Sequence, residues 1–117
     1  MKMEKMLLLL SFFGLSSLIV FETQKGTASY YSMKFQGKRT SSGERLHNDS
    51  LTAAHKNLPF GTKVRIRNLK NDSTVVVRIN DRLSPKSSRI VDVTVCAAKK
   101  LNFIRDGIAK VELHEIP

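Results

Sequence analysis

The segment Thr74–Arg82, TVVVRINDR, constrains the fold of this chain more than any other stretch. It is rich in β-branched aliphatic residues and holds no glycine or proline, which predicts a β-strand. Because strand side chains alternate between two faces, one face should carry Val75, Val77, Ile79 and Asp81. A carboxyl group at the end of an apolar row is partly desolvated, so the pKa of Asp81 should rise toward the value that a general acid needs near neutral pH. The alternative is that Asp81 pairs with Arg82 or caps a turn.

The N-terminal stretch has the composition of an export signal. Two lysines, Lys2 and Lys5, precede an uncharged apolar run, Leu7–Phe21, which is too short to span a membrane comfortably. No cysteine follows this run, so the chain is not expected to be a lipoprotein. No clear small-residue cleavage site follows it either, so an uncleaved inner-membrane anchor is the alternative to a cleaved signal. We expect residues 1–24 to be a signal peptide or anchor, and residues 25–117 to be one domain exported to the periplasm or cell envelope.

The positive charge of the chain belongs to the exported part. From Lys25 onward there are 18 Lys and Arg against 8 Asp and Glu, which accounts for the net charge of +10. Such a balance favours an anionic partner. For an exported chain this means cell-wall polymers or lipid head groups; nucleic acid is disfavoured because no aromatic residues interleave with the basic ones. Cys96 is the only cysteine, so no internal disulfide can form, and the domain is expected to be a monomer.

Alternating patterns predict a small all-β barrel. The segment Thr62–Leu69 alternates as Thr74–Arg82 does, and the turn between them predicts an antiparallel hairpin. Its core face should carry Val64 and Ile66. Its solvent face should carry a basic stripe made of Lys63, Arg65, Arg67 and Arg78. Further strands are expected at Gly26–Ser32, Leu51–Ala54, Arg89–Val93 and Gly107–Ile116, with Thr94 capping a short helix that runs to about Leu101. The pattern predicts a six-stranded barrel with one or two short helices.

Six short motifs follow one another along the exported part. They are Gly26-Thr27-Ala28-Ser29-Tyr30-Tyr31, Gly37-Lys38-Arg39-Thr40-Ser41-Ser42-Gly43-Glu44, Leu51-Thr52-Ala53-Ala54-His55, Leu58-Pro59-Phe60-Gly61-Thr62-Lys63-Val64, Asn80-Asp81-Arg82 and Arg89-Ile90-Val91-Asp92-Val93-Thr94. Because the six motifs occur in this order, the chain resembles the rare lipoprotein A (RlpA-like) family of septal-ring lytic transglycosylases, which have a double-psi β-barrel domain. Two positions depart from the family pattern: Leu83-Ser84-Pro85 stands where Gly-Pro is usual, and Ser42 stands where Asn is usual.

The resemblance implies cleavage of the β-1,4 bond between N-acetylmuramic acid and N-acetylglucosamine in peptidoglycan, with a 1,6-anhydro product. It points to Asp81, Glu44 and His55 as catalytic residues, with Asp81 acting as acid and then as base. Glu44 would hold substrate, stabilise positive charge or raise the pKa of Asp81, and His55 would bind sugar or orient a carboxylate. Substrate-binding residues are expected to be Tyr30, Tyr31, Thr40, Asn80 and Arg82.

Simpler interpretations of the same residues stay open. A glutamate such as Glu44 on a polar loop is commonly only solvated, and His55 could be an ordinary loop or capping residue. The spacing of His47 and His114 relative to His55 does not suggest a metal site, so neither a metal nor a cofactor is expected. The alternative function is that of a non-catalytic, expansin-like barrel that binds or loosens wall glycan.

Overall fold

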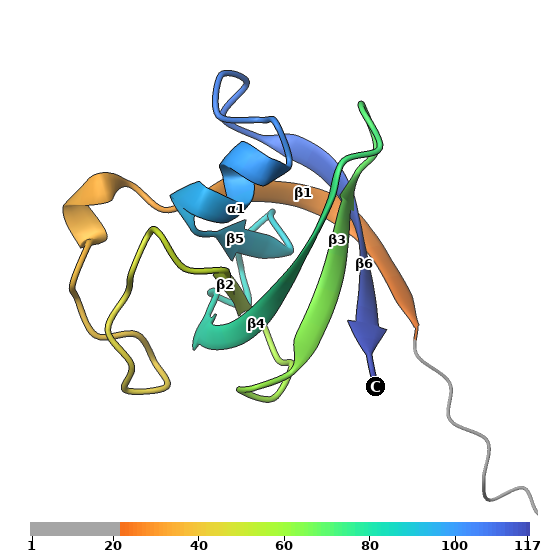
Figure 1. Cartoon of the computed structure of the whole chain (residues 1–117). Helices are drawn as coiled ribbons and strands as arrows, with labels where there is room; N and C mark the ends of the chain where they lie inside the picture. The colour runs from red at the N-terminus through yellow and green to blue at the C-terminus, as the bar shows by residue number, and fades with distance from the viewer. Residues whose placement is uncertain (1–21) are drawn as a thin grey trace, which may run out of the picture.

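The computed structural model of the protein describes residues 22–117, and six strands within them close into a barrel (Figure 1). The strands are β1 (Thr23–Tyr30), β2 (Thr52–His55), β3 (Lys63–Asn68), β4 (Thr74–Arg82), β5 (Val91–Val93) and β6 (Ala109–Ile116). One α-helix, α1 (Val95–Lys100), and one 3-10 helix, Met33–Phe35, accompany them. The predicted six-stranded all-β barrel with short helices is confirmed. The expected signal or anchor lies almost wholly outside the described residues, among which no helix is long and apolar enough to cross a membrane.

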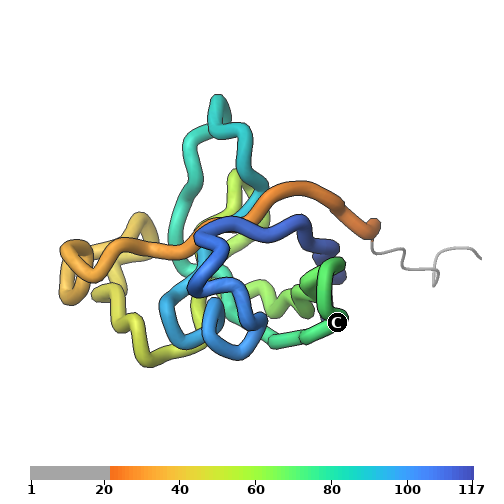
Figure 2. Tube along the Cα trace, turned by 90° about the horizontal axis from the view of Figure 1, so that it is seen from above, coloured from red at the N-terminus to blue at the C-terminus, as the bar shows by residue number. Residues whose placement is uncertain are grey.

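The strands follow one another around the barrel in the order β1-β5-β2-β4-β3-β6. Two neighbouring pairs are parallel, β1 with β5 and β2 with β4, and the other pairs are antiparallel. The hairpin of β3 and β4 forms as predicted, with Val64 opposite Val77. Residues 31–51 form a lobe on one side of the barrel, and the loop after β4 projects from its body (Figure 2). Hydrogen bonds join this lobe to the end of β4, including one from the N–H of Ser42 to the carbonyl of Asn80 at 3.3 Å.

Core positions follow the alternation that the sequence predicts. Val64, Ile66, Val75, Val77 and Ile79 are all buried, together with residues from the other strands and α1. Thr94 caps α1 as expected, because its side chain accepts a hydrogen bond from the N–H of Ala97. The barrel interior is therefore a packed apolar core.

The basic stripe is not a continuous positive surface. Arg67 lies 2.6 Å from Asp72 and 2.9 Å from Glu112, and Arg78 lies 2.9 Å from Glu44. Lys63 and Arg65 point into solvent as predicted. Ion pairs thus offset two of the four positive charges, so the surface available to an anionic polymer on this hairpin is centred on Lys63 and Arg65.

A bulge near the end of β4 changes which way Asp81 faces. The register with β2 runs from Ala53 opposite Ile79 directly to Ala54 opposite Asp81, which leaves Asn80 as an extra residue. Ile79 and Asn80 are consequently both buried, and the two-residue period is broken there. The prediction that Asp81 continues the apolar row of β4 is therefore wrong, because the bulge shifts it out of phase with that row.

Candidate active site

The loop Thr40–Glu44 is a tight turn that presents polar groups toward β4. The Glu44 carbonyl accepts hydrogen bonds from the backbone N–H of Thr40 (2.7 Å) and from its hydroxyl (2.8 Å). Gly43 has φ +93°. This conformation is strained for residues that carry a Cβ, which explains a glycine here. Thr40, predicted to bind substrate, therefore shapes the loop in this structure.

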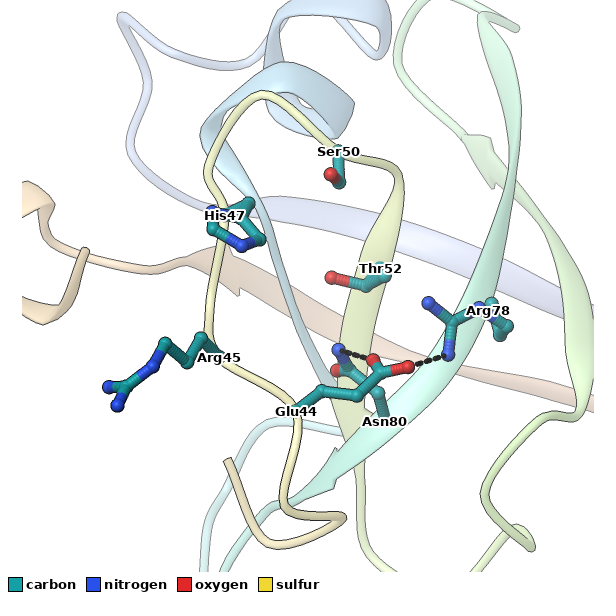
Figure 3. Close-up of a pocket in the computed structure, with 7 residues that line it drawn as sticks. All are labelled: Glu44, Arg45, His47, Ser50, Thr52, Arg78 and Asn80. Atoms are coloured by element: carbon teal, nitrogen blue, oxygen red, sulfur yellow. Dashed lines mark hydrogen bonds and ion pairs between the residues drawn. The ribbon is translucent and has the colours of Figure 1, made fainter. Parts of the chain in front are cut away.

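Both ends of this loop are fixed to the last residues of β4. The N–H of Ser41 donates to Asp81 Oδ1 at 2.8 Å. Glu44 Oε1 accepts from Asn80 Nδ2 at 2.8 Å, and Oε2 accepts from Arg78 at 2.9 Å (Figure 3). The structure thus brings Glu44 and Asp81, which are distant in the sequence, to the same end of one strand.

Hydrogen-bond donors surround the carboxylate of Asp81. Partial burial acts to raise its pKa, as the sequence led us to expect. Hydrogen bonds from the Tyr31 hydroxyl (2.5 Å to Oδ2) and from the N–H groups of Ser41 and Arg82 (2.8 and 2.9 Å to Oδ1) act against burial. These bonds outweigh burial and hold the pKa of Asp81 below its ordinary value. The expectation of a raised pKa is therefore wrong for the ligand-free protein, in which Asp81 is ionised at neutral pH.

Glu44 is also held in its charged form. The hydrogen bond from Asn80 and then the one from Arg78 lower the pKa of Glu44. Its side chain is 45% exposed, so it lies at the surface of the site. Glu44 is not among the main influences on the pKa of Asp81, which are burial and the donors around that carboxyl. A fixed negative charge at Glu44 suits the stabilisation of a nearby positive charge.

A pocket of about 360 Å³ opens beside these groups. Its lining residues are Glu44, Arg45, His47, Ser50, Thr52, Arg78 and Asn80 (Figure 3). Asp81 is next to the pocket through Asn80 without lining it. The wall is polar and carries both signs of charge, as a site for a hydroxyl-rich ligand would.

His55 is not brought into this pocket. Its side chain is buried, and Nδ1 accepts hydrogen bonds from the N–H groups of Asn57 and Leu58, both at 3.1 Å. Nε2 lies 3.0 Å from Gln24 Oε1, so this nitrogen carries the proton. Burial, and then the positive charge of Arg82, lower the pKa of His55 and keep the ring neutral. In this geometry His55 holds the turn after β2 and does not face a carboxylate.

Three of the remaining residues expected to bind substrate contact the two carboxylates. Tyr31 and Asn80 do so through their side chains, and Arg82 does so through its backbone N–H. Tyr30 instead donates to the carbonyl of Ile104 and packs edge-on against Phe103, so it belongs to the core margin. Arg82 lies over the ring of the exposed Phe60, with 4.2 Å between the guanidinium carbon and the ring centre.

The unusual Leu83 fits the fold without strain. Its side chain is buried, and its N–H donates to the carbonyl of His55 at 3.2 Å. Leu83 does not have a positive φ, so its backbone conformation does not require a glycine at this position. The apolar group introduced here therefore packs inward.

Sequence reasoning missed the contact between Arg78 and Glu44. Arg78 was assigned to the solvated stripe, although two-residue alternation within β4 already placed it on the face of Asn80. The other pocket residues that sequence reasoning missed are Arg45, His47, Ser50 and Thr52. Arg45 directly follows the motif that ends in Glu44, and Ser50 and Thr52 lie next to or within the motif Leu51–His55, which was the available signal.

Comparisons with known proteins agree with this architecture. A family model described as "Lytic transglycolase" matches residues 23–113. The endolytic peptidoglycan transglycosylase RlpA of Neisseria meningitidis is 47% identical over 94 residues, which cover 80% of this chain and 39% of that protein. The RlpA of Pseudomonas aeruginosa is 45% identical over 91 residues, covering 78% of this chain and 27% of the relative. The chain thus spans about two fifths of the length of these relatives or less.

Solved structures show the same fold at low identity. The apo expansin of Clavibacter michiganensis superposes with a TM-score of 0.66 at 20% identity, over 82% of this chain and 51% of that one. A papain inhibitor from Streptomyces superposes with a TM-score of 0.66 at 17% identity, over 82% of this chain and 96% of that one. The protein belongs to the lytic transglycolase family, and its described residues form a six-stranded double-psi β-barrel.

Proposed function

We propose that this protein is an endolytic lytic transglycosylase that cleaves the β-1,4 bond between N-acetylmuramic acid and N-acetylglucosamine in peptidoglycan. The observation that carries the proposal is the pairing of Glu44 and Asp81 at one end of β4, beside an open polar pocket. The names of the relatives, which are endolytic peptidoglycan transglycosylases, support the same activity.

Asp81 acts first as acid and then as base. Its proton passes to the glycosidic oxygen while the bond from that oxygen to C1 breaks. The C6 hydroxyl of the same sugar then bonds to C1, and its proton returns to Asp81. Atoms balance without water, so one carboxyl group completes the cycle, whereas a typical glycoside hydrolase uses two carboxyl groups in separate roles.

Substrate binding favours the protonated form of Asp81, which is the form that can act as the acid. In the ligand-free protein, hydrogen bonds from Tyr31 and from backbone groups keep this carboxyl ionised. A glycan chain laid over the site removes water and competes for the Tyr31 hydroxyl. Both changes raise the pKa of Asp81, adding to the effect of the burial already present.

The other groups position substrate and balance charge. Glu44, ionised and fixed by Asn80 and Arg78, stabilises the positive charge that develops at C1. Tyr31, Asn80 and Arg82 contact the sugar or orient the carboxylates. His55 positions the turn after β2 and takes no part in proton transfer.

The setting of the reaction follows from charge and from the export signal. We place the protein in the periplasm or cell envelope, as a secreted or membrane-anchored monomer that is not a lipoprotein. Lys63 and Arg65 are the exposed positive charges of the hairpin that would contact anionic wall polymers or lipid head groups.

The test is to incubate the protein with purified peptidoglycan and look for 1,6-anhydro products by mass spectrometry. Asp81→Asn keeps the shape of the side chain but cannot exchange a proton, so product formation should fall by about 100- to 10,000-fold while glycan binding persists. Asp106→Asn is a matched control, because Asp106 is an exposed carboxylate paired with Lys70 outside the pocket.

Two results would change the assignment. If the Asp81→Asn variant forms as much anhydro product as wild type, Asp81 is not the acid and base of the reaction. A wild-type protein that binds glycan but releases no anhydro product would mark the chain as a non-catalytic, expansin-like barrel.

A further inference from the structure

Two buried polar atoms in the wall of the pocket lack a hydrogen-bond partner within residues 22–117. They are Thr52 Oγ1 and Asn80 Oδ1. Thr52 is 5% exposed and Asn80 is 2% exposed, and both residues line the pocket. A third such atom, Asn48 Nδ2, belongs to a residue that does not line it. Buried polar atoms are nearly always paired, so two unpaired ones in one pocket wall need an explanation.

The hydrogen-bonding character of the free Asn80 atom is fixed by the neighbouring Glu44. Asn80 Nδ2 donates to Glu44 Oε1 at 2.8 Å, and a carboxylate can only accept. The other amide atom of Asn80 is therefore the oxygen, an acceptor. The Thr52 hydroxyl can both donate and accept. It points into the space between His47 and Glu44 in Figure 3.

The two residues lie on neighbouring parallel strands, β2 and β4. Thr52 of β2 is in register with Arg78 of β4, two residues before Asn80. Together they offer one acceptor and one donor from neighbouring strands to a ligand in the pocket. The Glu44 side chain lies across Asn80 in Figure 3 and holds the amide of Asn80 with its oxygen free for a ligand.

We propose that Thr52 and Asn80 form a subsite for the acetamido group at C2 of an amino sugar. The acetamido N–H donates to Asn80 Oδ1, and its carbonyl oxygen accepts from the Thr52 hydroxyl. A glucosyl ring has a single oxygen at this position and cannot serve both atoms in the same way. This inference rests on the proposed function, and it makes Thr52 a residue that determines specificity for N-acetylated glycan.

The test compares two neutral β-1,4-linked hexasaccharides that differ at C2, N-acetylchitohexaose and cellohexaose, by titration calorimetry. Wild-type protein should bind N-acetylchitohexaose more tightly. Thr52→Val is nearly isosteric and removes the hydroxyl, so affinity for N-acetylchitohexaose should fall about 10-fold while affinity for cellohexaose changes little. Thr52→Ser keeps the hydroxyl and should retain most of the preference.

Stability measurements separate binding from a structural role. The hydroxyl of Thr52 has no partner in the described residues, so Thr52→Val should leave the Tm unchanged or raise it. In the peptidoglycan assay the same variant should raise KM more than it lowers kcat. A Tm that falls in proportion to affinity would mean that the hydroxyl supports the fold, and would overturn the inference.

The remaining outcomes distinguish this inference from the proposed function. Equal losses for both hexasaccharides, no loss for either, or no wild-type binding to either would overturn the subsite. If wild type forms anhydro product and Thr52→Val has an unchanged KM, the proposed function is supported and the subsite is refuted. A Thr52-dependent preference for N-acetylchitohexaose without any anhydro product would retain the subsite and remove the catalytic proposal.

Discussion

Replacing Tyr31 by phenylalanine tests the most direct control on the proposed acid. The Tyr31 hydroxyl donates to Asp81 Oδ2 at 2.5 Å, and this bond favours the ionised carboxyl. Tyr31→Phe keeps the ring and deletes the donor. The backbone donors of Ser41 and Arg82 remain, so the variant isolates one of the hydrogen bonds that lower the pKa of Asp81.

The size of the effect follows from the kind of bond that is lost. A hydrogen bond to a charged group contributes about 1.5–3 kcal/mol, and the partial exposure of Asp81 favours the lower end of this range. Losing this bond removes one of the interactions that lower the pKa of Asp81, so that pKa should rise. If Asp81 is the acid, the alkaline limb of the pH–activity profile should move to higher pH in the variant.

The stability of the protein should change with a defined sign. A carboxyl whose pKa is lowered by folding stabilises the native state above its unfolded pKa, and that contribution is lost as pH falls through the folded pKa. Tyr31→Phe should therefore lower the free energy of unfolding by about 1–2 kcal/mol at neutral pH. The difference from wild type should narrow in strong acid, where Asp81 is protonated in both proteins.

The assay is a carboxyl-carbon NMR titration of the aspartates, with urea unfolding at neutral and acid pH beside it. Tyr30→Phe is the matched control, because the Tyr30 hydroxyl donates to the Ile104 carbonyl and not to Asp81. An Asp81 pKa that is unchanged or lower in Tyr31→Phe, or that rises equally in Tyr30→Phe, would refute the reasoning.

Two further predictions concern the loop after β4 and the charged surface. Leu83→Gly, which restores the glycine usual in the family, should lower the free energy of unfolding by about 3 kcal/mol because Leu83 is buried and does not have a positive φ; urea unfolding with equal or greater stability would contradict this packing. Attachment to peptidoglycan sacculi should weaken when salt rises from ~0.1 to ~1 M, since the screening length falls from about 10 to about 3 Å. The double variant Lys63→Ala/Arg65→Ala should reduce attachment at low salt. If the amount pulled down changes with neither salt nor the double substitution, Lys63 and Arg65 are not the binding surface.

The sequence alone located all six strands, although β1 begins at Thr23 and not at the expected Gly26, and it determined the inward positions of the β3–β4 hairpin. Alternation is a local property of the backbone, so Val64 and Val77 could be assigned to the core from their spacing. The cap at Thr94 is likewise local, since it depends on a hydroxyl and an N–H three residues apart. The ordered motifs also identified the family, and they pointed to both carboxylates of the proposed site.

Only the tertiary structure decided how the site is assembled. The bulge at Asn80 arises where β4 meets β2, and no property of the segment Thr74–Arg82 by itself reveals that partner. It turned Asp81 out of the apolar row, toward the donors of Tyr31 and Ser41.

The ionisation of Asp81 and the environment of His55 depended on the same long-range contacts. Desolvation at a strand end was foreseen, but the direction of the Asp81 pKa was set by hydrogen bonds from two distant segments. The His55 side chain lies outside the pocket because its Nε2 is hydrogen-bonded to Gln24 of β1. Only the closed barrel brings β1 near this ring. Local patterns fix which face a side chain occupies, whereas the partners that set its charge come from parts of the chain that meet only after folding.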